Sequence, residues 1–354
     1  LGGPRNFFAL LISLNMLKRS GSHGPSGNRK TFRNRTNAPE PSDRLLRSSA
    51  AKRALLTSKS LESLVPEENV STKVNFEKLL GDDEYILLYL GYLKKTERKF
   101  YPKLVIQPAG GVLGECRSSV VNWLIMLHVT LDLRRETLLF SVDLFDIVLS
   151  RKTIKAARMQ LYALTATWIS AKINEVRTID ATDLIRSTSH RYKKRTICRC
   201  EQAILKLVGF KLLLPVSLHF TYIYITALDL EQDQNHDKLF HTASYLVDTL
   251  LPNHSYLSLT PSLVSAASIY LSYMFVYDFT FQWPEGLKQL TSYTENDLKP
   301  VCKLMLQEVA KARSSELKGS YVKYRSDKYL RISVSSWMEP STIQTLINYR
   351  FSNF

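Results

Sequence analysis

Apolar residues recur at helical spacing along most of the chain after residue 74, and strand-like alternation of apolar and polar residues is rare. Trp123 and Leu127, for example, fall on one face of a helix. The pattern predicts an N-terminal helix in residues 73–101 and a first domain of five helices in residues 115–214. The five helices are expected at 117–131, at 141–150, at 154–173, from Asp180 onward, and at 194–208.

A second group of five helices is expected after Pro215, which makes residues 215–315 a second domain and residues 316–354 a C-terminal extension. These helices are expected at 218–228, 237–251, 261–274, 285–290 and 295–312. Two groups of similar length suggest a duplicated all-α unit, a repeat inferred from pattern alone. Asp183, three residues after Asp180, predicts a capping box at the start of the fourth helix.

Residues 1–72 are predicted to form a basic tail without a core. Residues 18–45 are rich in Lys, Arg, Asn, Ser, Gly and Pro and hold few bulky apolar side chains, so we expect disorder. Residues 1–60 hold 12 Lys and Arg against two Asp and Glu, and residues 61–354 hold 36 against 30. Most of the net charge of +16 therefore lies in the tail, and the folded body does not favour nucleic acid as a partner.

The apolar run at residues 7–17 has basic neighbours and is similar to the core of a signal peptide. It is too short to span a bilayer, and no small-residue cleavage site follows it. We expect residues 1–15 not to belong to the native protein. No later stretch is apolar enough to cross a membrane, so no membrane partner is expected.

Residues that commonly carry catalysis or bind metals are scattered. Cys116, Cys198, Cys200 and Cys302 form neither a disulfide framework nor a zinc set, and reduced, mostly buried thiols are expected. The sequence contains no glycine-rich phosphate loop and no nucleophile elbow, and its histidines lack partners at useful spacing. We predict a non-catalytic protein without metal or cofactor.

Lys172 and Glu201 each lie on an otherwise apolar stripe of a predicted helix. A lone charge in such a place costs several kcal/mol unless it is paired or hydrogen-bonded. Two interpretations are open. The pair forms an internal salt bridge that sets helix register, or it forms a polar island in an apolar surface that contacts a partner. For Arg117 and Asp146 the pattern favours a structural salt bridge.

At these residues the sequence resembles the A/B-type mitotic cyclins, with a slight leaning to the B-type. The resemblance rests on CRSSVVNWL at 116–124, KINE at 172–175 and YKKRTICRCEQAILKLVGF at 192–210. It continues to KYRSDKYLRIS and covers about residues 74–335. The resemblance implies two tandem five-helix cyclin boxes behind an N-terminal helix and a disordered basic tail.

The resemblance also assigns roles to residues. Those that match the family's kinase contacts are Lys172, Glu201, Ile86, Ile173, Glu175, Leu205 and Leu212. Arg117 and Asp146 match the family's internal bridge. The positions that match its docking patch for Arg-x-Leu substrates are Cys116, Ser119, Val120, Trp123, Met159 and Gln160. This patch is eroded, because Ser119 replaces an apolar residue and Met126 replaces an acidic one.

The expected function is that of a regulatory subunit of a serine/threonine protein kinase, a cyclin-dependent kinase, acting in cell-cycle control. Two alternatives stay open: a transcription-factor-type cyclin fold that binds DNA or the general transcription machinery, and a degenerate cyclin that no longer binds a kinase. In the tail, Arg53 and Leu56 form an R-x-x-L motif of the destruction-box type, which would engage ubiquitin-ligase machinery. The basic clusters of the tail predict a nuclear protein with a cytoplasmic pool.

Overall fold

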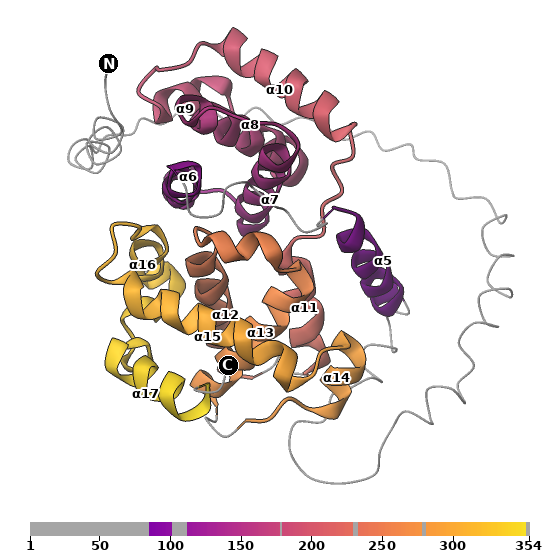
Figure 1. The fold of residues 1–354 in the computed structure, drawn as a ribbon, viewed down its shortest axis with the longest axis vertical. Helices are drawn as coiled ribbons and strands as arrows, with labels where there is room; N and C mark the ends of the chain where they lie inside the picture. The colour runs from indigo at the N-terminus through magenta and orange to yellow at the C-terminus, as the bar shows by residue number, and fades with distance from the viewer. Residues whose placement is uncertain (1–84, 101–111, 178, 229–232, 278–280, 352–354) are drawn as a thin grey trace, which may run out of the picture. The chain divides into compact units, whose positions relative to one another are not determined.

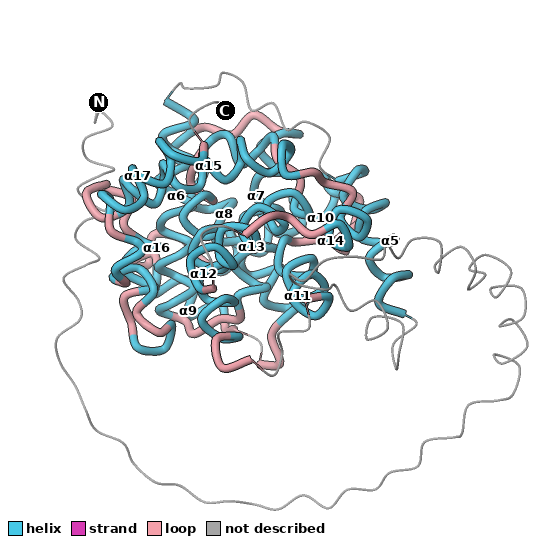
Figure 2. Tube along the Cα trace, turned by 90° about the horizontal axis from the view of Figure 1, so that it is seen from below, coloured by secondary structure: helices cyan, strands magenta, loops and turns pink. Residues whose placement is uncertain are grey.

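The computed structural model describes residues 85–100, 112–177, 179–228, 233–277 and 281–351, all within the unit formed by residues 70–354. Every regular element in these ranges is a helix, as Figure 2 shows, which confirms the all-α fold class. The basic tail and the R-x-x-L motif at Arg53–Leu56 lie outside the described residues. No described helix is both long enough and apolar enough to cross a bilayer.

Helices α6 to α10 form the first domain. Their bounds are Val112–Thr130 for α6, Arg135–Arg151 for α7, Ala156–Asn174 for α8, Ala181–Ser187 for α9 and Lys194–Val208 for α10. Helix α8 packs against α6, α7 and α10 and is therefore the centre of the domain. Gly209 ends α10 in the left-handed conformation, with φ of 63°, which is the usual role of glycine at a helix end.

Helices α11 to α15 form the second domain, in the other half of the ribbon in Figure 1. Their bounds are Ser217–Ala227 for α11, His236–Leu250 for α12, Pro261–Val276 for α13, Glu285–Thr291 for α14 and Glu295–Ala312 for α15. Helix α13 packs against α11, α12 and α15 and takes the central place that α8 takes in the first domain.

The C-terminal extension is more structured than the sequence pattern indicates. It contains α16 at Gly319–Tyr324, three short 3-10 turns, and α17 at Pro340–Arg350. Helix α16 packs on α6 of the first domain and α17 packs on α15 of the second. The extension therefore covers parts of both domains.

The capping box predicted at Asp180 is wrong. Asp180 stands at the N-cap of α9 but its side chain makes no cap hydrogen bond, because its Oδ2 accepts the Thr182 hydroxyl at 2.6 Å. A capping box forms instead at the start of α15, where the carboxylate of Asp297 accepts from the backbone N–H of Thr294 at 2.8 Å.

Arg117 and Asp146 form a buried bidentate ion pair between α6 and α7, with both N–O distances at 2.7 Å. The Nη1 of Arg117 also donates to the carbonyls of Leu251 and Pro252, at 3.1 and 3.2 Å, in the second domain. One guanidinium thus satisfies a carboxylate of one domain and the end of a helix of the other. The structural salt bridge that the sequence pattern favoured is therefore present, and its arginine also joins the two domains.

Candidate functional site

Lys172 and Glu201 form an ion pair between the C-terminal end of α8 and the middle of α10. The ammonium group of Lys172 lies 3.7 Å from the centroid of the Trp168 ring, a cation–π contact. The side chain of Lys172 is 38% exposed and that of Glu201 is 17% exposed, so solvent reaches the pair from one side. The structure brings together the two charges that the sequence singled out and leaves them at the surface.

Apolar side chains of α8, of α10 and of the segments that follow these helices are exposed or half-buried. Ile173 is 44% exposed, and Leu205 and Leu212 are half-buried. Three more exposed apolar residues were missed by the sequence analysis: Val176, Phe210 and Leu213. Phe210 has φ of 59°, so the turn after Gly209 turns its ring outward in a backbone conformation unusual for a bulky residue. The sequence could have indicated these exposed residues, because apolar residues stand on both sides of Gly209 and Lys211.

Glu175 has an internal role in this structure. Its Oε1 accepts from the backbone N–H of Arg134 at 2.8 Å and from the Thr137 hydroxyl at 2.5 Å. Both donors lie at the start of α7, where a carboxylate stabilises the unpaired N–H groups of the first turn. The resemblance placed Glu175 among the kinase contacts. In the structure, one of its carboxylate oxygens is hydrogen-bonded to the start of α7.

Helix α5, at Tyr85–Phe100, is held on the second domain by two polar anchors. Lys94 donates to the carbonyls of Leu290 and Thr291 at the end of α14, at 3.0 and 2.8 Å. Glu97 accepts from the backbone N–H and the hydroxyl of Ser262 in the first turn of α13, at 3.1 and 2.7 Å. A cation at a helix C-terminus and an anion at a helix N-terminus are both favourable arrangements.

The free side of α5 is apolar. Leu88, Tyr89 and Tyr92 are 47%, 43% and 48% exposed, and Ile86 is half-buried. On the anchored side, burial raises the pKa of the Glu97 carboxyl and lowers the pKa of the Lys94 ammonium. The helix therefore presents a second exposed apolar surface, on which Ile86 was the residue that the sequence analysis named.

The residues at the positions of the substrate-docking patch are mostly inside the protein. Ser119, Val120, Trp123, Met159 and Gln160 are all less than 9% exposed, and only Cys116 is half-exposed. The side-chain oxygen of Gln160 accepts from Arg191, at 3.3 Å, and from the hydroxyl of Tyr192, at 3.4 Å. In this conformation little of the patch is left for a peptide to contact.

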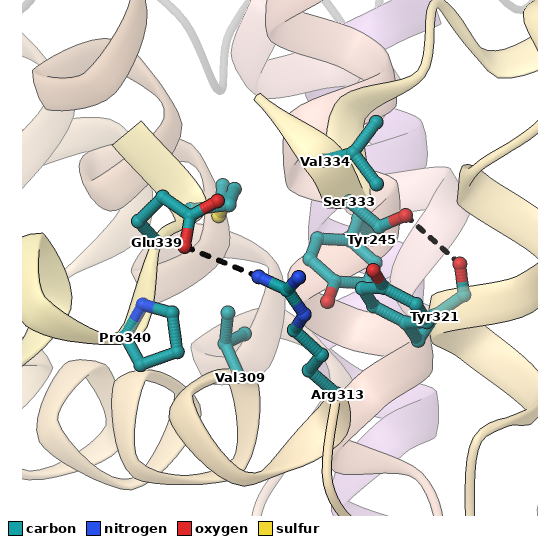
Figure 3. A pocket seen from close by; sticks show the side chains of 9 residues that line it. Tyr245, Val309, Arg313, Tyr321, Ser333, Val334, Glu339 and Pro340 are labelled. Carbon is teal, nitrogen blue, oxygen red and sulfur yellow. Dashed lines mark hydrogen bonds and ion pairs between the residues drawn. The ribbon is translucent and has the colours of Figure 1, made fainter. Parts of the chain in front are cut away.

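A cavity of about 90 Å³ lies in the second domain, between α12, α15 and the C-terminal extension (Figure 3). Its charged lining residues, Arg313 and Glu339, pair with each other at 3.3 Å. A space that holds only a few water molecules is too small for a nucleotide. Among the described residues no group of three or more His, Cys, Asp or Glu is placed to hold a metal ion.

Comparison with known proteins assigns both domains. Residues 89–213 match the family described as Cyclin, N-terminal domain, and residues 215–337 match Cyclin, C-terminal domain. The chain belongs to the cyclin family. The boundary between the two matches falls in the segment that joins α10 to α11. The first match contains α6 to α10 and most of α5, and the second contains α11 to α15 and the C-terminal extension as far as residue 337.

The relatives include mitotic cyclins of the B and A types. The chain is 29% identical over 265 residues to the G2/mitotic-specific cyclin-B of Patella vulgata and 30% identical over 239 residues to that of Arbacia punctulata. These alignments cover 75% and 66% of this chain but only 63% and 57% of the relatives. The G2/mitotic-specific cyclin-A of Drosophila melanogaster is 27% identical over 267 residues, which are 75% of this chain and 53% of that protein.

Among solved structures, a viral cyclin from herpesvirus saimiri has the same fold. Its TM-score is 0.55 at 20% sequence identity, and the alignment covers 62% of this chain and 97% of that one. At this identity the likeness concerns the fold alone. The relatives therefore confirm the predicted family and the paired cyclin domains.

A buried charge cluster, which the sequence analysis missed, joins the two cyclin domains near α16. Its carboxylate is Asp248 of α12, which is fully buried. Lys323 of α16 donates to Asp248 Oδ2 at 2.7 Å, and the hydroxyl of Tyr324 donates to the same oxygen at 3.0 Å. Arg135 of α7 lies 3.0 Å from Asp248 Oδ1. Burial alone would raise the pKa of Asp248, but Arg135 and Lys323 together hold it below its usual value.

His128 lies beside this cluster. Because of this histidine, we expect the protein to be less stable in mild acid. It is 4% exposed, and burial, with Lys323 nearby, holds its pKa well below the usual value. Below a pH of about 6.5 the unfolded chain binds a proton at this residue and the folded protein does not. The free energy of unfolding should therefore fall as the pH decreases, by at most about 1.4 kcal/mol per pH unit for this histidine.

The measurement is urea unfolding at pH 7.5, 6.5 and 5.5. His128→Leu should make the pH dependence shallower, whereas His190→Asn, at an exposed histidine, should leave it unchanged. Some dependence should remain, because burial also lowers the pKa of His241. A His128→Leu protein with the full pH dependence would show that this histidine is protonated as easily in the folded protein as in the unfolded chain.

Proposed function

We propose that the chain is a non-catalytic regulatory subunit that binds and activates a cyclin-dependent protein kinase, a serine/threonine kinase, in cell-cycle control. The observation that carries the proposal is the half-exposed Lys172–Glu201 ion pair on two helices that also carry or lead into exposed apolar residues. The cyclin domains and the mitotic relatives support it. Because the chain covers less than two thirds of those relatives, its activity and partner are proposed from its own surface.

The surface suits a partner that presents backbone polar groups among apolar side chains. Lys172 can turn its remaining N–H groups toward carbonyls of the partner, and Glu201 can accept from N–H groups. Ile173, Phe210 and Leu213 supply the apolar area, each square ångström of which contributes about 25 cal/mol when it is buried. Specific interfaces bury an apolar core and add a limited number of direct hydrogen bonds, and this surface offers both kinds of contact.

Activation then follows from differential binding. A kinase alone favours an inactive conformer, and a rigid helical surface that binds only the active conformer shifts the population toward it. The two cyclin domains are suited to this because buried ion pairs, at Arg117–Asp146 and Arg135–Asp248, join their helices. The kinase supplies the chemistry, since it positions ATP, metal ions and substrate.

The test is reconstitution with a panel of purified cyclin-dependent kinases. Full-length protein should co-purify with at least one kinase and raise its activity on a peptide substrate by an order of magnitude or more. Binding without activation would contradict the regulatory role. Binding to none of the kinases would favour a degenerate cyclin or the transcription-factor-type alternative. The nuclear location and the tail-directed degradation stay predictions from the sequence.

A further inference from the structure

The charge of the folded body is divided unevenly between the two cyclin domains. Residues 115–214 hold 17 Lys and Arg against nine Asp and Glu, whereas residues 215–315 hold six against ten. The modest positive charge of the whole body therefore hides a basic first domain beside an acidic second one. Several exposed cations of the first domain lie on α10 and at the end of α7.

Helix α10 presents different residues on its buried face, on one flank and on its outer face. The residues on its buried face are Ile197, Cys200, Ile204 and Val208. One flank holds Glu201 and Leu205, which belong to the proposed kinase site. Arg199 and Lys206 lie roughly 150° around the helix axis from Glu201, at 3.6 residues per turn. Arg195 precedes Arg199 by four residues, so the three cations share the outer face of α10, opposite its buried residues, and all three are exposed.

The end of α7 adds two more cations beside α10. Arg151 donates to the carbonyl of Leu207 at 3.3 Å, which places it against the last turn of α10. Lys152 is its neighbour and is also exposed, with its ammonium 5.6 Å from the centroid of the Tyr162 ring. We call the five cations the basic ridge: Arg151, Lys152, Arg195, Arg199 and Lys206. In the described part of the chain, none of the five forms an ion pair with a carboxylate.

The ridge lies at the surface in a place that the proposed kinase contact leaves open. In Figure 1, α10 runs along the edge of the first domain, outside α8 and α9. From Arg195 to Lys206 the cations extend over about 16 Å at the rise of an α-helix. A line of unpaired cations of this length matches an extended polyanion better than a single phosphorylated side chain, which needs several donors that converge on one point.

We propose that the basic ridge binds the sugar–phosphate backbone of a double-stranded nucleic acid. Cations spaced along a helix contact successive phosphates, and such contacts are independent of base sequence. A single strand fits less well, because strong binding of unpaired bases needs exposed aromatic rings on which they stack. The tyrosines beside the ridge, Tyr162 and Tyr192, are 9% exposed and half-buried respectively. The ridge would let the protein hold a nucleic acid while it binds a kinase.

The test compares two full-length variants that lose equal charge. The ridge variant carries Arg195→Gln, Arg199→Gln and Lys206→Gln. The control variant carries Lys311→Gln, Lys318→Gln and Arg325→Gln, three exposed cations outside the first domain. Binding to a fluorescent 24-base-pair duplex is measured by anisotropy between 50 and 300 mM NaCl. Because the basic tail is present in both variants, its contribution to binding cancels in the comparison.

The ridge variant should bind at least tenfold more weakly at 100 mM NaCl. Its slope of log Kd against log salt should be smaller than that of the wild type by roughly 2 to 3, since each lost phosphate contact removes about 0.9. The control variant should keep the slope of the wild type. A third variant, Arg195→Lys with Arg199→Lys, keeps the charge and should also keep the slope, which separates loss of charge from damage to α10.

Three outcomes would overturn the proposal. Equal binding by the ridge and control variants would assign the affinity to the tail. Competition by polyglutamate as effective as that by duplex DNA, at equal charge concentration, would identify an acidic polypeptide as the partner. Loss of kinase co-purification in the ridge variant would show that the ridge belongs to the kinase site. Because kinase binding is measured separately, failure of the ridge proposal leaves the proposed regulatory function intact.

Discussion

Asp248→Asn is expected to lower the free energy of unfolding by about 3–5 kcal/mol, the range observed when one partner of a buried ion pair is removed. Asp248 is fully buried and is the carboxylate between two cations, Arg135 and Lys323, of which Lys323 is 2% exposed. Asparagine keeps the shape but leaves both cations in the interior without an anion. Urea unfolding of the full-length protein at pH 7.5 measures the loss.

Two further variants make this result interpretable. Asp132→Asn removes an exposed carboxylate that pairs with Lys328 in the same part of the fold, and no measurable change is expected. Asp248→Asn combined with Lys323→Met should be more stable than Asp248→Asn alone, because one uncompensated cation becomes an apolar side chain. If Asp248→Asn costs no more than Asp132→Asn, the cluster does not hold the domains together.

The sequence predicted the helices that local signals define. Helix α10 was placed at 194–208 and α15 at 295–312, with the bounds that the structure shows. Both have a strong apolar stripe, and α10 ends at a glycine. The C-terminal helices were missed because they carry weak local signals: α16 has six residues and α17 is largely polar on its outer side. Their position is determined by packing on α6 and α15, which no local pattern shows.

The candidate site was predictable to a similar degree. Lys172 and Glu201 could be found because each interrupts an apolar stripe, and the structure pairs them. The interdomain cluster could not be assembled in the same way, because Arg135, Asp248 and Lys323 are far apart in sequence and only the docking of the two domains and α16 brings them together. The charge on the apolar face of α12 at Asp248 was the signal that could have indicated it.

The Lys172–Glu201 pair still allows the two interpretations that the sequence left open. If the pair only sets the register of α8 and α10, Lys172 and Glu201 interact with each other and a partner does not contact them. If the pair is a polar island in an interface, each charge faces a matching group of the kinase. Deleting both residues does not separate the interpretations cleanly, since a change in helix register would also weaken binding.

A charge reversal separates them. Lys172→Glu combined with Glu201→Lys rebuilds an ion pair inside this chain with opposite polarity. Because the pair is half-exposed, the free energy of unfolding should change by no more than about 1 kcal/mol. Kinase affinity should nevertheless fall by at least about a hundredfold, or about 2.7 kcal/mol, because like charges then meet across the interface.

The affinity is measured by titrating the fluorescently labelled kinase that co-purifies with the wild type, and the stability by urea unfolding of the same preparations. Arg186→Glu combined with Asp183→Arg is the matched control, an exposed ion pair reversed on α9, away from the apolar surface. It should leave both quantities unchanged. Wild-type kinase affinity in the reversed Lys172–Glu201 protein would mean that the pair is internal and that the kinase is bound by the surrounding apolar residues alone.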